Sequence, residues 1–222
     1  MLLIALPKSA STSLMFSIAK ILNIKYQNGI SRKKYDKSLF CEGFEEMQEF
    51  YGTTIKRSYE FLDKWISRKD IIYKEHLLPT KDHIEYIKRI NKPIVILTRD
   101  PGESIDNHIR TIELYKQGKL TKREQKGLLI HKMCKLSIGK LLRDFTYFND
   151  GWLNSGVNAL YITFNELVLN PKQTIKRVLN HYGFKTLGKK LVLLKAKGNR
   201  GNYNTYTGVG IKRLKDANNC TA

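Results

Sequence analysis

The chain has 222 residues, of which 41% are hydrophobic, so it is long enough to bury the core of one domain and short for two. Lys and Arg number 40 against 20 for Asp and Glu, and the net charge of +20 favours anionic partners such as nucleic acid, acidic glycans or phosphorylated cofactors. Three cysteines without C-x-x-C spacing argue against a disulfide framework or a zinc site, and no apolar run approaches the ~20 residues of a membrane span. We therefore expect residues 1–222 to form a single soluble domain in a reducing, cytoplasmic compartment.

Short apolar segments alternate along the chain with longer segments of helical periodicity. The predicted strands are 2–6, 71–75, 93–98 and 159–163. The predicted helices are 11–22, 43–50, 55–67, 80–90, 102–116, 122–149 and 172–183. This alternation predicts an α/β fold of three α/β/α layers, and the near-continuous apolar strands predict a central, mainly parallel sheet. Ligands of such sheets bind beyond the carboxyl ends of the strands, so the residues that follow each strand are candidate site residues.

The first strand leads through a lysine and a run of hydroxyl residues into a helix. The run reads Pro7-Lys8-Ser9-Ala10-Ser11-Thr12-Ser13. Unpaired N–H groups at the helix start, the helix dipole, the lysine charge and the hydroxyls together suit a phosphate. The glycines of the G-x-x-x-x-G-K-[ST] consensus are missing, which argues against an ordinary nucleotide kinase. A plain helix start with Ser9 or Ser11 as N-cap is the alternative that this segment alone leaves open.

Two later strand ends carry basic side chains. The second strand leads into Lys74, Glu75 and His76, and the third ends at Arg99, whose guanidinium can bind a phosphate through two parallel hydrogen bonds. Asn107, eight residues after Arg99, adds an amide donor. Taken singly, a histidine such as His76 is more often an ordinary surface or structural residue, and the alternative for Arg99 and Asp100 is that they merely cap the next helix.

In their joint order these segments resemble the sulfotransferases that use 3′-phosphoadenosine 5′-phosphosulfate (PAPS). The family reads Pro-Lys-Ser-Gly-Thr-Thr-Trp at 7–13, Lys-Thr-His-Leu-Pro around His76 and Arg-[Asn/Asp]-Pro from Arg99. The segments that begin at Phe164 and at Lys197 resemble the family's Tyr-Glu-Asp-Leu and Lys-Gly-x-x-Gly motifs. The resemblance spans residues 2 to 203 and implies a P-loop-like sulfotransferase fold.

The resemblance also implies a role for each matching residue. PAPS would be the sulfuryl donor, and no metal would be needed. The implied catalytic residues are His76 as general base, Lys8 beside the leaving phosphate and Lys74 beside the sulfuryl group; Glu75 is the competing base, because glycosaminoglycan-type relatives use a glutamate. The implied donor-binding residues are Lys8, Ser9, Ala10, Ser11, Thr12, Ser13, Arg99, Asn107, Phe164, Lys197 and Gly198.

Several positions depart from the family pattern, and four of them bear on whether the chain has turnover. Ala10 replaces a glycine, Ser13 a tryptophan, Asn107 a serine and Ala196 an arginine. These replacements leave open a second reading, in which the chain is a sulfotransferase relative that binds the nucleotide without turnover.

The irregular and basic segments are where we expect the acceptor. Residues 24–60 and 103–150 are the predicted acceptor-pocket segments, and 185–210 the predicted flexible loop that covers the nucleotide. The acceptor would be a small molecule or a glycan, including an anionic one, with a hydroxyl or an amine. The alternative for the basic helix in 103–150 is a solvated face. A basic nucleic-acid-binding or polyanion-binding protein is the rival function, although the dispersed charges predict no specific nucleic acid.

Overall fold

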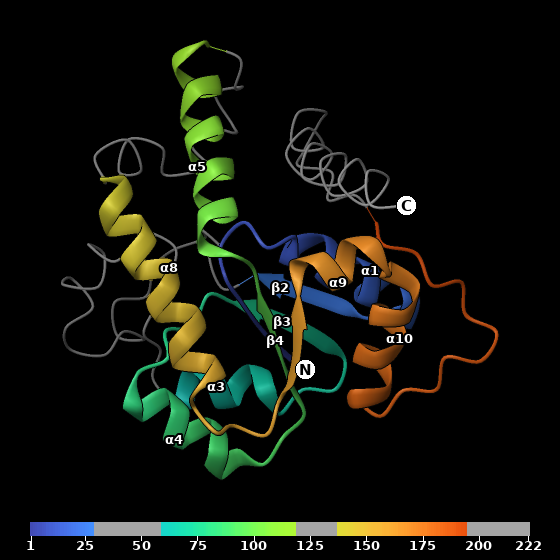
Figure 1. Ribbon diagram of the computed structural model, residues 1–222. Coiled ribbons are helices and arrows are strands. Elements are labelled where there is room, and N and C mark those ends of the chain that lie inside the picture. The colour runs from blue at the N-terminus through green and yellow to red at the C-terminus, as the bar shows by residue number, and fades with distance from the viewer. Residues whose placement is uncertain (29–58, 119–136, 195–222) are drawn as a thin grey trace, which may run out of the picture.

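The computed structural model describes residues 1–28, 59–118 and 137–194 (Figure 1). Within these ranges five strands form one sheet: β1 (Leu2–Ala5), β2 (Lys25–Asn28), β3 (Ile71–Glu75), β4 (Ile94–Thr98) and β5 (Leu160–Thr163). The strand order is β2-β3-β1-β4-β5, and every neighbouring pair is parallel. The predicted parallel α/β sheet is confirmed.

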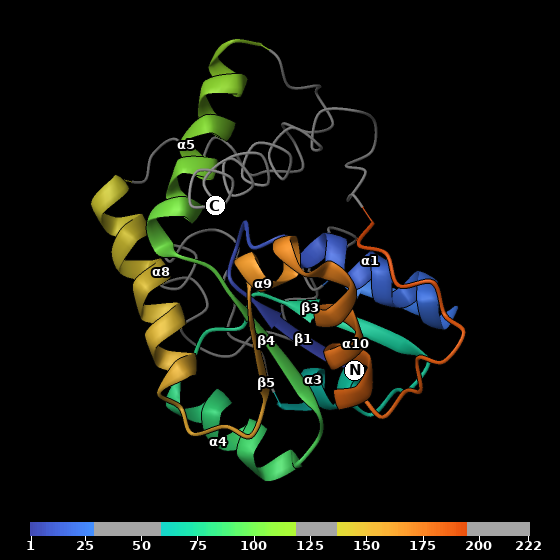
Figure 2. The ribbon, with the colours of Figure 1, turned by 45° about the vertical axis from the view of Figure 1, so that its right-hand side comes forward.

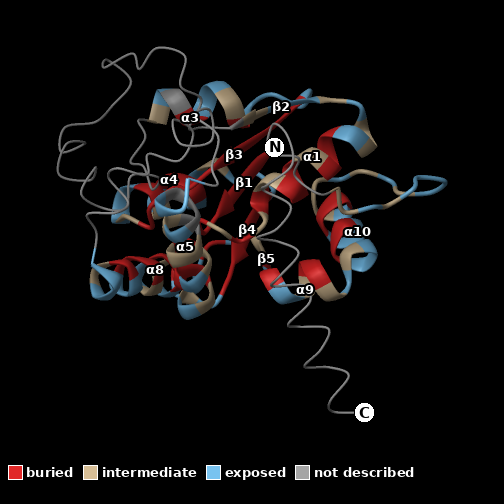
Figure 3. Ribbon diagram, turned by 90° about the horizontal axis from the view of Figure 1, so that it is seen from above, coloured by how far each residue is buried: buried red, intermediate tan, exposed pale blue. Residues whose placement is uncertain are grey.

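The central strands are apolar on both faces because helices cover both. Along β1, Leu2 and Ile4 belong to one buried cluster while Leu3 and Ala5 belong to the other. Successive side chains of a strand point to opposite faces, so one short strand supplies both layers of core. Viewed from above, the buried residues run through the sheet and the inner sides of the helices (Figure 3).

Two groups of helices cover the sheet, one on each face (Figures 1 and 2). The first group comprises α3 (Tyr59–Ile66), α4 (Lys81–Ile90), α5 (Pro101–Lys116) and α8 (Ile138–Leu153). The second comprises α1 (Ser11–Leu22), α9 (Phe164–Leu169) and α10 (Pro171–His181). In the described ranges, no helix has both the length and the apolar character needed to cross a membrane.

The predicted elements and the observed ones differ in three places. The strand β2 was not predicted, because its Lys-Tyr-Gln-Asn sequence is polar and it lies at the sheet edge. The helix α9 was not predicted because it is only six residues long; a capping box between Thr163 and Glu166 starts it. Within the predicted helix 122–149 the structure describes α8 alone, which begins at Ile138 and extends to Leu153. The predicted helix 43–50 lies outside the described residues.

The topology places a switch point beside the central strand. From β1 the chain passes through α1 to β2 on one side of the sheet, whereas from β4 it passes to β5 on the other. The connections therefore diverge above the carboxyl ends of β1 and β4, which is where open α/β sheets bind ligands. The loop at Lys8 and Arg99, which directly follows β4, meet at this point.

Candidate anion-binding site at the strand ends

The loop between β1 and α1 is held in a strained backbone conformation. Lys8 and Ala10 have φ values of 65° and 62°, in the left-handed region that non-glycine residues rarely adopt. The Ser9 hydroxyl donates to the Leu6 carbonyl at 2.6 Å, and Leu6 N donates to Leu97 O at 2.9 Å. The loop is thus tied both to itself and to β4.

The first turn of α1 has no side-chain cap. Its N-cap residue is Ala10, which offers no side-chain acceptor, so neither Ser9 nor Ser11 serves as the N-cap. Ser9, Ser11 and Ser13 are buried, while Thr12 is partly exposed. A helix start of this type leaves backbone N–H groups for an anion.

His76 is oriented by two hydrogen bonds. Its Nδ1 lies 2.6 Å from the carbonyl oxygen of Ala5 at the end of β1, and its Nε2 lies 3.1 Å from Lys74 Nζ. Burial, followed by the charge of Lys74, lowers the pKa of His76 well below 6.5, and the charge of Lys8 acts in the same direction. His76 is therefore neutral at pH 7, in contact with Lys74 and within the electrostatic field of Lys8.

Lys8 and Lys74 place positive charge at this edge of the sheet, where water solvates it only in part. Burial lowers the pKa of Lys8 to about 8. Burial also lowers the pKa of Lys74 to about 8; the carboxylate of Glu75 opposes this shift, and the charge of Lys8 adds to it. At pH 7 both side chains are still mainly cationic. An anion bound beside them would offset their mutual repulsion and would replace part of the solvation that burial removes.

Glu75 is the last residue of β3, and His76 follows it. It is fully buried, and its carboxylate accepts hydrogen bonds from the Tyr73 hydroxyl and from the His76 backbone N–H. Both contacts hold the carboxylate on the core side. The geometry favours His76 over Glu75 as the candidate base, because the His76 ring contacts Lys74 and the end of β1.

Arg99 links three strand ends. Its Nη1 donates to the Lys8 carbonyl at 2.8 Å, and its Nε donates to Glu103 at 3.1 Å. Its guanidinium carbon lies 3.7 Å from the ring centroid of Phe164, the first residue of α9, which is buried. Arg99 therefore braces the Lys8 loop, and Phe164 supports the guanidinium.

The remaining predicted donor-binding residues are more scattered. Asn107 donates from Nδ2 to Glu103 O at 3.0 Å, within its own helix. Asp100, not Arg99, caps α5, because its Oδ1 accepts from Glu103 N at 2.9 Å. Lys197 and Gly198 lie outside the described residues, as do most of 24–60, the part of 103–150 between α5 and α8, and 185–210 beyond residue 194.

His108 is a site residue that the sequence reading missed. It lies on α5, it is fully buried, and burial together with the charge of Lys8 lowers its pKa to about 4. One signal was present in the sequence: His108 shares a helix face with Ser104, which is also buried. Without the docked helix, that face cannot be assigned to the site.

Helix α8 holds the segment that follows His76. Trp152 Nε1 donates to Leu77 O at 2.9 Å, and a Cβ placed on Gly151 would come within 2.4 Å of the Pro79 ring. On the other side, Asn149 Nδ2 donates to Arg99 O at 2.7 Å. The same helix therefore contacts both halves of the site.

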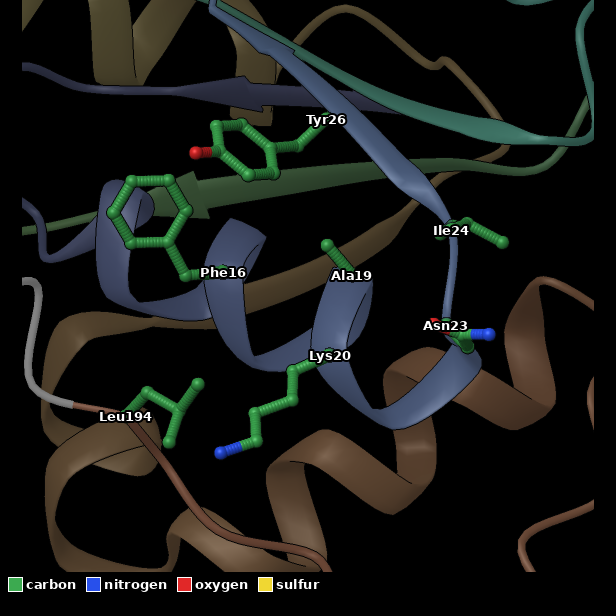
Figure 4. A pocket seen from close by; sticks show the side chains of 7 residues that line it. All are labelled: Phe16, Ala19, Lys20, Asn23, Ile24, Tyr26 and Leu194. Atoms are coloured by element: carbon green, nitrogen blue, oxygen red, sulfur yellow. The ribbon is translucent and has the colours of Figure 1, made fainter.

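Two further features bear on what the site can bind. Among residues 1–28, 59–118 and 137–194, no three His, Cys, Asp or Glu side chains come together as metal ligands. A pocket of about 560 Å³ lies elsewhere, on the outer side of α1 beside β2, and none of the site residues lines it. Figure 4 shows Phe16, Tyr26, Lys20 and Leu194 around that pocket.

The fold and the site define an α/β chain with a basic site at its topological switch point. No protein-family model and no curated protein sequence matches the chain. Several solved structures are similar to it, among them two sulfotransferases. A sulfotransferase from Alicyclobacillus acidocaldarius is 14% identical, with a TM-score of 0.47, over 97% of this chain and 94% of that one. The sulfotransferase domain from the curacin biosynthetic pathway is 13% identical, with a TM-score of 0.45, over 93% of this chain and 82% of that one.

Proposed function

We propose that the chain is a sulfotransferase that moves the sulfuryl group of PAPS to a hydroxyl or amine and releases adenosine 3′,5′-bisphosphate. The observation that supports this most is the position of neutral His76, which is fixed by Ala5, contacts Lys74 and feels the charge of Lys8 at the carboxyl ends of adjacent strands. A base next to two cations is what deprotonation of an acceptor beside an anionic donor requires.

The proposed reaction is an in-line displacement at sulfur. His76 Nε2 takes the proton of the acceptor hydroxyl as its oxygen bonds to sulfur, and the bond from sulfur to the bridging oxygen of the 5′-phosphate breaks. Lys8 stabilises the charge that develops on that oxygen, and Lys74 the sulfuryl oxygens. The bond electrons leave with the nucleotide, and the proton remains on His76. The scheme uses no metal.

The proposed donor site has two parts. Lys8 and the segment Ser9–Ser13 would hold the 5′-phosphosulfate, with the uncapped start of α1 supplying N–H donors. Arg99, Asn107, Lys197 and Gly198 would hold the 3′-phosphate, and the adenine would lie beside Phe164 under the Arg99 guanidinium. The acceptor is proposed to be a small molecule or glycan, including an anionic one, bound by segments 24–60 and 103–150.

Calorimetry with adenosine 3′,5′-bisphosphate, followed by a labelled-sulfate screen of phenols, alcohols, amines and sugars, tests the proposal. We expect nucleotide binding that weakens at least tenfold in Lys8→Met. Absence of nucleotide binding by the wild type, together with sequence-specific oligonucleotide binding, would overturn the proposal. Nucleotide binding without turnover of any acceptor would favour the inactive relative instead.

Substitution of the base separates binding from chemistry. In His76→Ala we expect turnover to fall by at least 100-fold, because general-base catalysis contributes 10²–10⁴-fold, while nucleotide affinity changes less than threefold. Initial rates and calorimetry on the same preparations check this. Substantial residual turnover would reject His76 as the base and would make Glu75→Gln the next variant to measure.

A further inference from the structure

The two contacts of the His76 ring determine which nitrogen carries its proton. A carbonyl oxygen only accepts hydrogen bonds, so Nδ1, at 2.6 Å from Ala5 O, must be the protonated nitrogen. In the neutral ring the lone pair is then on Nε2. That nitrogen lies 3.1 Å from Lys74 Nζ, and an ammonium can only donate. The lone pair that a base needs is therefore already occupied.

We propose that Lys74 blocks His76 in the donor-free protein and frees it only when a sulfuryl group takes over the ammonium, so that a bound acceptor is deprotonated only when the donor is in place. This inference rests on the proposed function and assigns it an order of events. Lys74 would first donate a hydrogen bond to His76 Nε2 and then, once the donor is bound, to the sulfuryl oxygens.

The unequal freedom of the two side chains favours this exchange. The His76 ring is held at Nδ1 by a backbone carbonyl of β1, whereas Lys74 ends in a compact ammonium on a flexible four-carbon stem. Lys74 and His76 are 2% and 6% exposed, so little water competes for either group. An anionic sulfuryl oxygen is a stronger partner for an ammonium than a neutral imidazole, because the hydrogen bond is charge-assisted at both ends. Lys74 would move and the ring would stay.

The surrounding charges keep the His76 ring neutral and the Lys74 amine protonated, as the blocked state requires. The cations that act on His76 are Lys74 in the preceding strand, β3, and Lys8 in the loop after β1, and both disfavour the imidazolium. The carboxylate of Glu75 opposes the loss of charge on Lys74, whose pKa of about 8 leaves it mainly protonated at pH 7. The pair is thus an ammonium and a neutral imidazole, which is the combination that the hydrogen bond requires.

Long-range proton–nitrogen NMR spectra of the imidazoles in the full chain test the blocked state without any turnover. The chain has five histidines, and His76→Gln identifies the resonances of His76. We expect a neutral ring protonated at Nδ1, with Nε2 shifted upfield by the hydrogen bond from Lys74. In Lys74→Met, Nε2 should move downfield and the pKa of His76 should rise. Lys81→Met, which removes a lysine whose side chain is 87% exposed, should change neither value.

Nucleotide titrations of the same samples test the release. PAPS should move the wild-type Nε2 resonance downfield to its position in Lys74→Met, whereas adenosine 3′,5′-bisphosphate, which has no sulfuryl group, should leave it in place. A ring protonated at Nε2, or no response to Lys74→Met, would overturn the blocked state. PAPS binding that leaves Nε2 unchanged would overturn the release. If PAPS does not bind, the proposed function and the release both fail, while the comparison with Lys74→Met still decides the blocked state.

Discussion

Ala10 adopts a backbone conformation that is unfavourable for an alanine. A left-handed L-residue costs roughly 1–2 kcal/mol, and glycine avoids that cost at the expense of about 0.5–1 kcal/mol of chain entropy. Ala10 has a φ of 62° and precedes the first residue of α1. The strain is located in the loop that carries Lys8, where positioning of the lysine depends on the turn.

Replacement of Ala10 by glycine should stabilise the protein by about 0.5–1 kcal/mol, because the strain is removed. Ala19→Gly is the matched control, since Ala19 is buried inside the helix α1; there the same substitution should destabilise by about 1 kcal/mol or more. Denaturant unfolding of the two variants gives both values. Equal destabilisation by both would show that the loop is not strained.

The sequence predicts the positions of some side chains at the site better than those of others. Lys8, Lys74 and His76 directly follow or end strands, and the carboxyl ends of parallel strands meet at one edge, so their proximity follows from the sequence. The contact between Arg99 and Phe164 joins two strand ends separated by 65 positions, and only the docked sheet brings them together. The position of His108 depends on how α5 rotates against the loop, which no local pattern encodes.

Among the elements, the apolar runs predicted the central strands well because both faces of these strands are buried. The edge strand β2 has no such run, and its pairing with β3 is made by backbone groups that any sequence possesses. The helix boundaries at α1, α4 and α10 lie within one or two residues of the prediction, since a periodic apolar face and a helix-ending residue define each of them.

Helix α8 offers a test of how element packing supports the site. Gly151→Ala would place a methyl group against the Pro79 ring, which is rigid, so the segment after His76 must shift. We expect a loss of about 1–3 kcal/mol in unfolding free energy and a lower turnover number, with nucleotide affinity nearly unchanged.

Gly139→Ala is the matched control for this variant, because it lies in the same helix and a Cβ there meets nothing within 4 Å. It should leave turnover unchanged and stabilise α8 by up to about 1 kcal/mol. Thermal unfolding and initial rates separate the two variants. A Gly151→Ala protein as active as Gly139→Ala would show that α8 does not position the base.

At the scale of the whole molecule, stability should depend on pH through the buried cations and imidazoles. Burial and the charges of Lys74 and Lys8 lower the pKa of His76 well below 6.5, and burial and Lys8 lower the pKa of His108 to about 4. Below pH 6.5 the unfolded chain therefore binds protons that the folded chain does not. The free energy of unfolding should fall as the pH falls from about 6.5 to about 4, by up to about 1.4 kcal/mol per pH unit for each histidine.

Denaturant unfolding at several pH values measures this slope, and His76→Gln tests its origin. The amide of glutamine keeps hydrogen-bonding groups but does not titrate, so the slope between pH 6.5 and 5 should become shallower. Above pH 8 the lowered pKa values of Lys8 and Lys74 act in the same sense, and stability should rise with pH toward 10.5. An unchanged slope in His76→Gln would assign the acid destabilisation to other groups.

The contacts of α8 with both halves of the site have a consequence for cooperativity. Through Asn149 the helix is bonded to Arg99 and thereby to the carbonyl of Lys8, and through Trp152 it is bonded to the segment after His76. A small displacement of this one helix would move Lys8 and His76 together, the residues that we propose stabilise the leaving phosphate and act as the base. An acceptor that contacts α8 and a nucleotide that contacts Lys8 would then change each other's affinity by the same factor, in whichever order their binding is measured.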